Sequence, residues 1–329
     1  MRLTRDRLVQ IARETALKQA LSDPQLVAAY LTGSVRGGNP FLGNATDIDI
    51  IFVHAEQPKA QREIVPLTAE VHLDLFHFPR QDYDRPKELR VHPWLGPEVY
   101  DALPLYGTGH FFEFVQAGVR ADFHAPDNVL RRANRMLNTA RAIWSELPAG
   151  QESGPALLLS YFRSVNHAAN AIALLNGEPL SERRFLLQFP PLAVAAGRPE
   201  LSDALLHLLG AEQAGVEKLA AWMKDWQADF IQAADTSEGD ARISRPRLPY
   251  YRQACESLLG SASPQALLWP LLHTWTLAAA ALPVSFQTSW EAACQGLGLL
   301  GPAFDTRLSA LDQFLDQVEE LLEDFSRRT

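Results

Sequence analysis

The sequence predicts an α+β protein in which a small mixed β-sheet domain is followed by an all-α domain with the architecture of a helical bundle. Apolar or alternating runs rich in β-favouring residues, which are typical of strands, fall before residue 125. After that residue, apolar side chains recur at spacings of three and four, which is typical of helices. This change of period predicts two domains, residues 1–125 and 126–329.

The amino-terminal domain is expected to contain one amphipathic helix and a small sheet. Thr4 can cap the helix through its hydroxyl group, and an apolar stripe follows as far as Leu17. Three segments have strand character, at residues 27–32, 48–53 and 71–78. We expect these strands to form a sheet that the first helix flanks.

The carboxy-terminal domain is expected to be helical throughout. Asp127 can cap its first helix, and Gly177, Gly210 and Gly260 stand where glycines that end helices belong. The predicted helices are residues 130–147, 155–176, 200–209, 212–234, 249–259, 264–282 and 304–327.

One uncharged segment, residues 266–284, is about as long as a membrane span, which needs roughly 20 residues. Pro270 and His273 lie within it, and no cluster of Lys or Arg flanks it to orient a span. A helix buried inside the helical domain explains the same pattern, so we predict no association with a membrane.

Composition narrows the class of protein. The chain has 329 residues, of which 47% are hydrophobic and 21% charged, so it can bury a sizeable core. A formal net charge of −9 argues against binding to extended nucleic acid, which depends on broad neutralisation of phosphates. Cys255 and Cys294 show neither disulfide nor zinc-site spacing, and no signal-peptide pattern opens the chain. These features predict a cytoplasmic protein with reduced thiols.

The candidate residues for catalysis and metal binding lie where one predicted strand ends and the next begins. Asp47 and Asp49 are two residues apart at the start of a strand, so both carboxylates point to the same face. Such a pair repels unless a cation lies between its members, and hard oxygen ligands of this kind suit Mg²⁺. Gly33 and Ser34 follow the preceding strand, where exposed backbone N–H groups can approach an anion.

This ordered set of motifs resembles the nucleotidyltransferase superfamily related to DNA polymerase beta. The family signature is a Gly-Ser pair, an Asp-x-Asp strand often preceded by Ser or Thr, and a third carboxylate on a later strand. Gly33-Ser34, Thr46 and Asp47-Ile48-Asp49 match the first two parts. The two-domain organisation is similar to that of aminoglycoside and other antibiotic nucleotidyltransferases, in which an all-helical domain follows the catalytic one.

The resemblance implies specific roles for residues. Asp74 matches the third carboxylate, with Glu70 as the second choice, and Asp47, Asp49 and Asp74 would be the catalytic residues and the ligands of two Mg²⁺ ions. Gly33 and Ser34 would hold the β- and γ-phosphates of a nucleoside triphosphate. Arg36 stands where the family often has a small residue. The candidates for a cation that contacts the triphosphate are Arg36, Arg163, Arg183 and Arg184.

The implied activity is transfer of a nucleoside monophosphate, with ATP as the favoured donor, to a hydroxyl of a small molecule, with release of pyrophosphate. The helical domain would form the acceptor side of the cleft. Two alternatives stay open: a protein acceptor for AMP, and a non-catalytic or antitoxin-like module that keeps the fold. The sequence leaves the acceptor open, and it is compatible with a homodimer.

The remaining polar and aromatic residues have structural interpretations. Four residues of the helix at 155–176 lie on one face, which we interpret as solvated rather than as part of a site. His72 is interpreted as a structural histidine near the metal ligands. We expect the aromatic residues of the helical domain to belong to its core. The residues on that helix face are Tyr161, Arg163, Asn166 and Asn170, and the aromatic group with its histidine is Tyr250, Tyr251, Trp269, His273 and Trp275.

Overall fold

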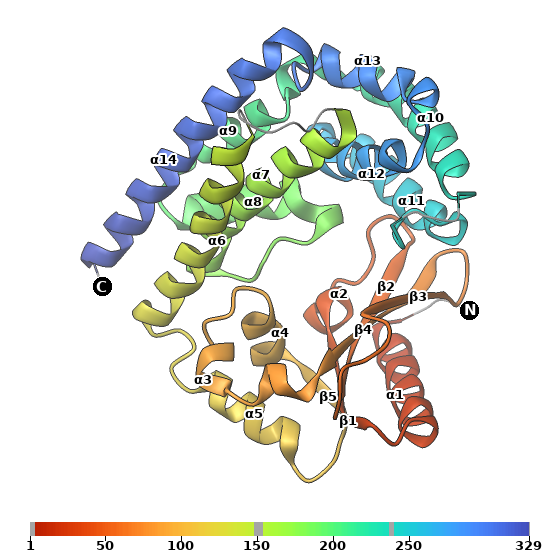
Figure 1. Cartoon of the computed structure of the whole chain (residues 1–329), viewed down its shortest axis with the longest axis vertical. Helices are drawn as coiled ribbons and strands as arrows, with labels where there is room; N and C mark the ends of the chain where they lie inside the picture. Colours follow the sequence, from red (N-terminus) through yellow and green to blue (C-terminus); the bar gives the residue numbers. More distant parts are fainter. Residues whose placement is uncertain (1–3, 148–153, 237–239, 329) are drawn as a thin grey trace. The chain divides into compact units, whose positions relative to one another are not determined.

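The protein is described by a computed structural model that covers residues 4–147, 154–236 and 240–328 (Figure 1). The chain divides into two compact units, residues 1–128 and 129–329. The first unit contains a mixed five-stranded sheet with helices on both of its faces, and the second is helical throughout the part that is described. The predicted α+β class is confirmed.

The sheet has the strand order β3-β4-β2-β1-β5. Strands β2 and β4 are parallel, whereas the pairs β1–β2, β1–β5 and β3–β4 are antiparallel. The three predicted strands correspond to β1, β2 and β4, and the two edge strands were not predicted. The bounds are Leu26–Thr32 for β1, Thr46–His54 for β2, Arg62–Pro66 for β3, Val71–Pro79 for β4 and Leu103–Gly107 for β5.

Helix α1 (Arg5–Ser22) covers one face of the sheet. The Thr4 hydroxyl accepts a hydrogen bond from the backbone N–H of Arg7, which confirms the predicted cap. Alanine and leucine side chains on the inner face of the helix pack against alternate residues of β2, which point to this face because side chains alternate along a strand. The buried residues are Leu8, Ala12 and Ala16 of α1 and Ile48, Ile50 and Phe52 of β2.

The opposite face carries a second apolar cluster, in which Tyr30 and Ile51 of the sheet pack with Phe112. Three short helices supply its outer side, none of them predicted, because one to three helical turns give too little periodicity to recognise. They are α3 (Pro86–Leu89), α4 (Leu95–Asp101) and α5 (Phe111–Arg120). The cluster does not extend to the starts of β2 and β4. On this face of the sheet, both starts carry polar side chains.

The second unit contains the seven predicted helices, with differences at their ends. Helix α6 begins at Pro126, so Asp127 lies in its first turn instead of capping it. Two helices were missed, and one of them, α8, contains Pro190 and Pro191, which disguise a helical pattern. The helices are α6 (Pro126–Glu146), α7 (Gly154–Asn176), α8 (Phe185–Ala195), α9 (Leu201–Leu208), α10 (Val216–Ala233), α11 (Leu248–Leu259), α12 (Leu268–Ala281), α13 (Thr288–Gly296) and α14 (Phe304–Arg328).

The uncharged segment forms the end of a 3-10 turn, Pro264–Leu267, and then α12, and most of its residues are buried as predicted, although Val284 at its end is exposed. The segment can bury its threonine hydroxyls because they form hydrogen bonds with tryptophan side chains. The indole N–H groups of Trp226 and Trp290 donate to the hydroxyls of Thr274 and Thr276, both at 3.0 Å. Among the described helices, none has both the length and the apolar character needed to cross a bilayer.

Candidate metal centre

Three carboxylates meet where β2 and β4 run side by side. Asp49 of β2 is paired in register with Asp74 of β4, and Asp47 lies two residues earlier on β2, so all three point to one face. One ligand oxygen from each lies within 4.8 Å of the others. Asp47 and Asp74 are buried, with exposed fractions of 8% and 2%, and Asp49 is partly buried. The structure thus brings together the three residues that the sequence predicts as metal ligands.

The arrangement is electrostatically costly without a counter-charge. Two carboxylates less than 5 Å apart repel by roughly 3 kcal/mol at the effective dielectric that describes groups near a protein surface. Three such groups, two of them buried, therefore favour binding of a cation. All of the donor atoms are carboxylate oxygens, the ligand type that Mg²⁺ prefers. The residues present therefore fit a divalent metal site.

Gly33 lies directly against the Asp49 carboxylate. Strand β1 ends at Thr32, which is paired with Asp49, and the chain then turns through Gly33 with a φ angle of +68°. A Cβ atom built on Gly33 would overlap Oδ2 of Asp49 and would lie 2.8 Å from its Cγ. Both the backbone conformation and the close approach therefore require glycine at this position.

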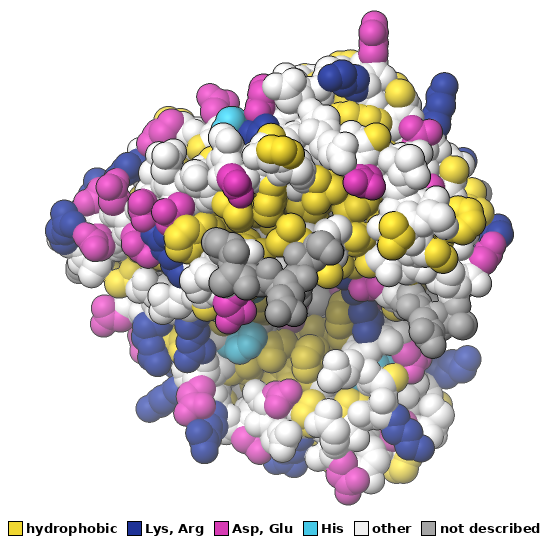
Figure 2. All heavy atoms as spheres, turned by 45° about the horizontal axis from the view of Figure 1, so that its top comes forward, with side chains coloured by type: hydrophobic (Ala, Val, Ile, Leu, Met, Phe, Trp, Pro, Cys, Tyr) yellow, Lys and Arg dark blue, Asp and Glu magenta, His cyan; other side chains and the backbone are white. Residues whose placement is uncertain are grey.

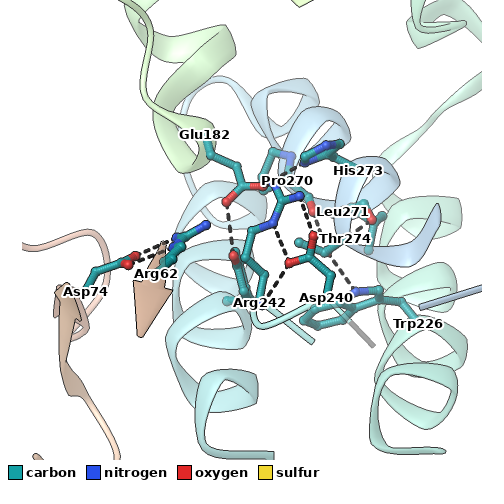
Figure 3. Close-up of polar contacts among 11 residues, drawn as sticks. Arg62, Asp74, Glu182, Trp226, Asp240, Arg242, Pro270, Leu271, His273 and Thr274 are labelled. Carbon is teal, nitrogen blue, oxygen red and sulfur yellow. Dashed lines mark hydrogen bonds and ion pairs between the residues drawn. The ribbon is translucent and has the colours of Figure 1, made fainter. Parts of the chain in front are cut away.

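Arg62 binds Asp74, and the sequence analysis missed it (Figure 3). Its Nε atom donates to Oδ1 of Asp74 at 2.8 Å, and its Nη2 atom donates to Oδ2 at 2.6 Å. Arg62 lies on β3, an edge strand whose sequence REIVP is too short and too exposed to show a clear pattern. The turn that returns the chain from β3 to β4 around Thr68 is the signal that could have located a hairpin here.

The structure places Ser34 and Arg36 in the short helix α2 (Gly33–Gly37), whose first residue lies against Asp49. The Ser34 hydroxyl donates to the backbone carbonyl of Pro40 at 3.4 Å, and Arg36 forms an ion pair with Asp101 at the end of α4. The predicted contact of Gly33, Ser34 and Arg36 with a nucleotide stays a prediction.

The two other residues considered near the site have structural surroundings. His72 is paired in register with Asp47 and is fully buried. Glu70 accepts hydrogen bonds in the turn before β4, through its carboxylate from the Thr68 hydroxyl and through its carbonyl from the N–H of Thr46. Asp74, not Glu70, therefore completes the acidic group of the described residues.

An acid in α4 has a strongly perturbed pKa. Burial raises the pKa of Glu98 to about 7. Tyr30 and Tyr83 pack in the same apolar cluster as residues of α4, the helix that carries Glu98. Their hydroxyl groups share a hydrogen bond of 2.9 Å. Glu98 thus titrates close to neutral pH, and no sequence pattern indicated it.

In the helical unit, the polar face of α7 is structural. Tyr161 and Asn170 are buried, so the interpretation of this face as solvated is wrong for both of them. The Tyr161 hydroxyl donates to the carbonyl of Leu208 at 2.9 Å, and Asn170 Oδ1 accepts from the N–H of Leu180 at 2.7 Å. These contacts fasten α7 to neighbouring segments. The side chains of Tyr161 and Asn170 therefore stabilise the fold of the helical unit.

A partly buried carboxylate, that of Glu182, also organises the helical unit (Figure 3). Glu182 accepts hydrogen bonds from His273 at 2.7 Å, from the Tyr251 hydroxyl at 3.0 Å and from Arg242 at 3.3 Å. Burial alone would raise the pKa of Glu182, but the hydrogen bond and charge of His273 and the charge of Arg242 outweigh it and hold the pKa well below its usual range. The expected core placement of the aromatic residues is confirmed for Tyr250, Tyr251, Trp269 and Trp275.

Comparisons with known proteins add little to this geometry. No family model matches the chain, and no curated protein matches it. A solved structure to which the chain is similar is a nucleotidyltransferase-like protein from Exiguobacterium sibiricum 255-15, with 9% sequence identity, coverage of 97% of this chain and 91% of that chain, and a TM-score of 0.30. A similarity this weak supports no inference about function. The functional argument therefore rests on the geometry of the acidic group.

Proposed function

We propose that the protein is a metal-dependent nucleotidyltransferase that transfers AMP from ATP to a hydroxyl group of a small molecule and releases pyrophosphate. The observation that carries the proposal is the group formed by Asp47, Asp49 and Asp74, whose ligand oxygens lie within 4.8 Å of one another. The sequence order of a Gly-Ser turn, an Asp-x-Asp strand and a later acidic strand supports the same activity.

The three carboxylates would hold Mg²⁺, with two ions expected when the triphosphate is present. Bound there, the metal supplies positive charge that stabilises the entering and leaving oxygens of an in-line displacement at the α-phosphorus. The chain positions these ligands through the in-register pairing of β2 with β4. Gly33 leaves the Asp49 carboxylate in place because it has no side chain of its own.

The remaining roles follow the sequence motifs. Backbone N–H groups at Gly33 and Ser34 would bind the β- and γ-phosphates. Asp74 is the proposed acceptor of the proton that the attacking hydroxyl group loses. The helical unit would supply the binding surface for the acceptor.

The nature of the surface supports a small acceptor over extended nucleic acid. The net charge is −9, and on the face shown in Figure 2 the basic side chains are interspersed with acidic ones. A polynucleotide bound through many phosphates would favour a continuous basic surface. A location in the cytoplasm and assembly as a homodimer remain part of the proposal.

The test is a thermal-shift titration with ATP, GTP, CTP and UTP, each with and without Mg²⁺, combined with an assay for pyrophosphate release. Ligand that binds the folded state stabilises it, by about 2.7 kcal/mol at a hundred times the dissociation constant. We expect a Mg²⁺-dependent shift that is greatest with ATP. The Asp47→Asn/Asp49→Asn double variant should lose this shift while it remains folded, because a repulsive pair has been relieved.

Asp84→Asn is the matched control, because Asp84 is an exposed carboxylate in the same unit that forms only a weak ion pair with Arg80. It should keep the full nucleotide response. A wild-type protein that shows no shift with any nucleotide would contradict the proposal. That outcome would favour a non-catalytic or antitoxin-like module with this fold, whereas binding of ATP without a small-molecule acceptor would direct the search to a protein acceptor.

A further inference from the structure

Arg62 donates two hydrogen bonds to Asp74, one to each carboxylate oxygen, and we call this bidentate contact the fork. The carboxylate that it occupies is only 2% exposed. Arg62 and Asp74 lie on adjacent antiparallel strands, where Arg62 is paired with Phe76 and Asp74 with Ile64. The contact is therefore a diagonal one across the β3–β4 hairpin, on the face that carries the metal ligands. Bidentate pairs of this kind are among the strongest hydrogen-bonded contacts in proteins.

The guanidinium group also contacts the ring of Phe76, the residue paired with Arg62 on β4. Its central carbon lies 4.8 Å from the centroid of the Phe76 ring, within range for a cation–π contact. The side chain of Arg62 is 29% exposed, so solvent reaches part of it while its charged end contacts Asp74. Arg62 is thus oriented toward Asp74 by the hairpin and the ring together.

This contact places a positive charge where a metal ion would otherwise act. The acidic group carries three formal negative charges, and Arg62 offsets one of them at Asp74. Asp47 and Asp49 lie on the neighbouring strand β2, with a ligand oxygen of each within 4.8 Å of one of Asp74. Mg²⁺ is commonly bound by one or two carboxylates together with substrate phosphates.

We propose that Arg62 is a positioning residue that competes with a divalent cation for Asp74. Without nucleotide, Arg62 stays on Asp74 and one ion binds at Asp47 and Asp49. A second ion reaches Asp74 only when the triphosphate supplies further oxygen ligands and negative charge that draw Arg62 away. Loading of the second ion therefore depends on the nucleotide. This inference rests on the proposed function, because it assumes that the acidic group binds metal.

The alternative is that Arg62 only orients Asp74 as a metal ligand and stays in place. The two roles predict opposite signs. Removing an outer partner that orients a ligand typically weakens metal affinity, by about 10–100-fold. Removing a competitor strengthens it, because both Asp74 oxygens become available and one positive charge leaves the site.

The experiment measures Mn²⁺ binding by calorimetry, with electron paramagnetic resonance of free Mn²⁺ as a second readout, in the full chain without nucleotide. Arg62→Met keeps much of the length and apolar packing but removes the fork and the charge. We expect wild-type protein to bind one ion, and Arg62→Met to bind a second ion or to bind Mn²⁺ at least about tenfold more tightly, which is the lower end of the range for outer-sphere changes. Weaker or unchanged binding in Arg62→Met overturns the proposal.

Arg80→Met is the matched control. Arg80 also lies 4.8 Å over a phenylalanine ring, that of Phe111, but its carboxylate partner is the exposed Asp84. Its removal should leave Mn²⁺ binding unchanged, and a change like that of Arg62→Met would show a general effect of lost charge and would overturn the specific role.

Stability separates misfolding from the expected effect. Arg62→Met leaves a buried carboxylate without its fork, so the metal-free variant should melt at a lower temperature than wild type, and Mn²⁺ should raise its melting temperature more than it raises that of wild type. A variant that does not regain stability with Mn²⁺ contradicts the competition. If wild-type protein releases pyrophosphate but Arg62→Met binds metal less well, the proposed function stands and this inference fails. If neither protein binds Mn²⁺ with or without ATP, both fail.

Discussion

The Asp49 carboxylate occupies the space that a side chain at position 33 would need. Gly33 turns the chain at the end of β1 with a φ angle of +68°, and a Cβ atom there would lie 2.8 Å from Asp49 Cγ. The glycine of the Gly-Ser motif therefore has a role besides any contact with phosphate. It allows the loop to approach the metal ligand on the neighbouring strand.

Gly33→Ala should consequently damage the metal site more than the fold. The left-handed backbone costs about 1–3 kcal/mol for a residue with a side chain, and the overlap displaces Asp49 in addition. Gly38→Ala is the matched control, since Gly38 has a φ angle of +90° but an added Cβ would meet no atom within 4 Å. We expect similar losses of unfolding free energy in urea for both variants, and loss of Mn²⁺ binding only in Gly33→Ala. Equal metal binding in the two would contradict the role of the contact.

The raised pKa of Glu98 predicts a pH dependence of stability. The pKa is about 7 in the folded protein because of burial, and near 4.3 in the unfolded chain. Between these values the folded state binds more protons than the unfolded state, so stability contributed by the protonated group is lost as pH rises. Glu98→Gln removes this loss, and its stability relative to wild type should increase from pH 5 to pH 8.

Urea denaturation at pH 5, 6, 7 and 8 measures this difference. Glu88→Gln in the neighbouring helix α3 is the control, because the carboxylate of Glu88 is 65% exposed and forms an ion pair with Arg85. It should give a curve parallel to that of wild type. A parallel curve for Glu98→Gln as well would show that Glu98 does not keep its proton in the folded state.

The ion pair between Arg36 and Asp101 predicts that Arg36 stabilises the contact between α2 and α4. Their side chains are 32% and 26% exposed, so the pair should contribute about 0.5–1 kcal/mol. In a double-mutant cycle of Arg36→Gln and Asp101→Asn, the double variant should be little less stable than either single variant. If Arg36→Gln alone lowers the stabilisation by ATP, Arg36 is the cation that contacts the nucleotide among the four candidate arginines.

Much of the fold follows from local patterns. Strands β1, β2 and β4 are predictable because each is a buried run with β-favouring side chains, and α14 because apolar residues recur along it at helical spacing. The missed elements lack such a pattern. Strand β3 is short and mostly exposed at the edge of the sheet, and α8 contains two prolines.

The residues of the candidate site also fall into two groups, those that local sequence patterns identify and those that depend on tertiary contacts. Asp47 and Asp49 can be recognised together because they share one strand and one face, and Gly33 because it directly follows a strand. Arg62 could not be assigned, since its contact with Asp74 depends on the pairing of β3 with β4. Glu98 could not be recognised because its pKa depends on burial by residues far away in the sequence.

The pairing of β2 with β4 has a consequence for how the protein tolerates change. Nine consecutive pairs run from Thr46–Val71 to His54–Pro79 without a shift. The same register that buries Ile48 and Ile50 against α1 sets Asp49 beside Asp74. Insertions or deletions in the loop at 38–45, which leads into β2 just before Asp47, can therefore remodel what surrounds the acidic group and leave its spacing intact. The surroundings of the site can diversify by loop length while the strands preserve its centre.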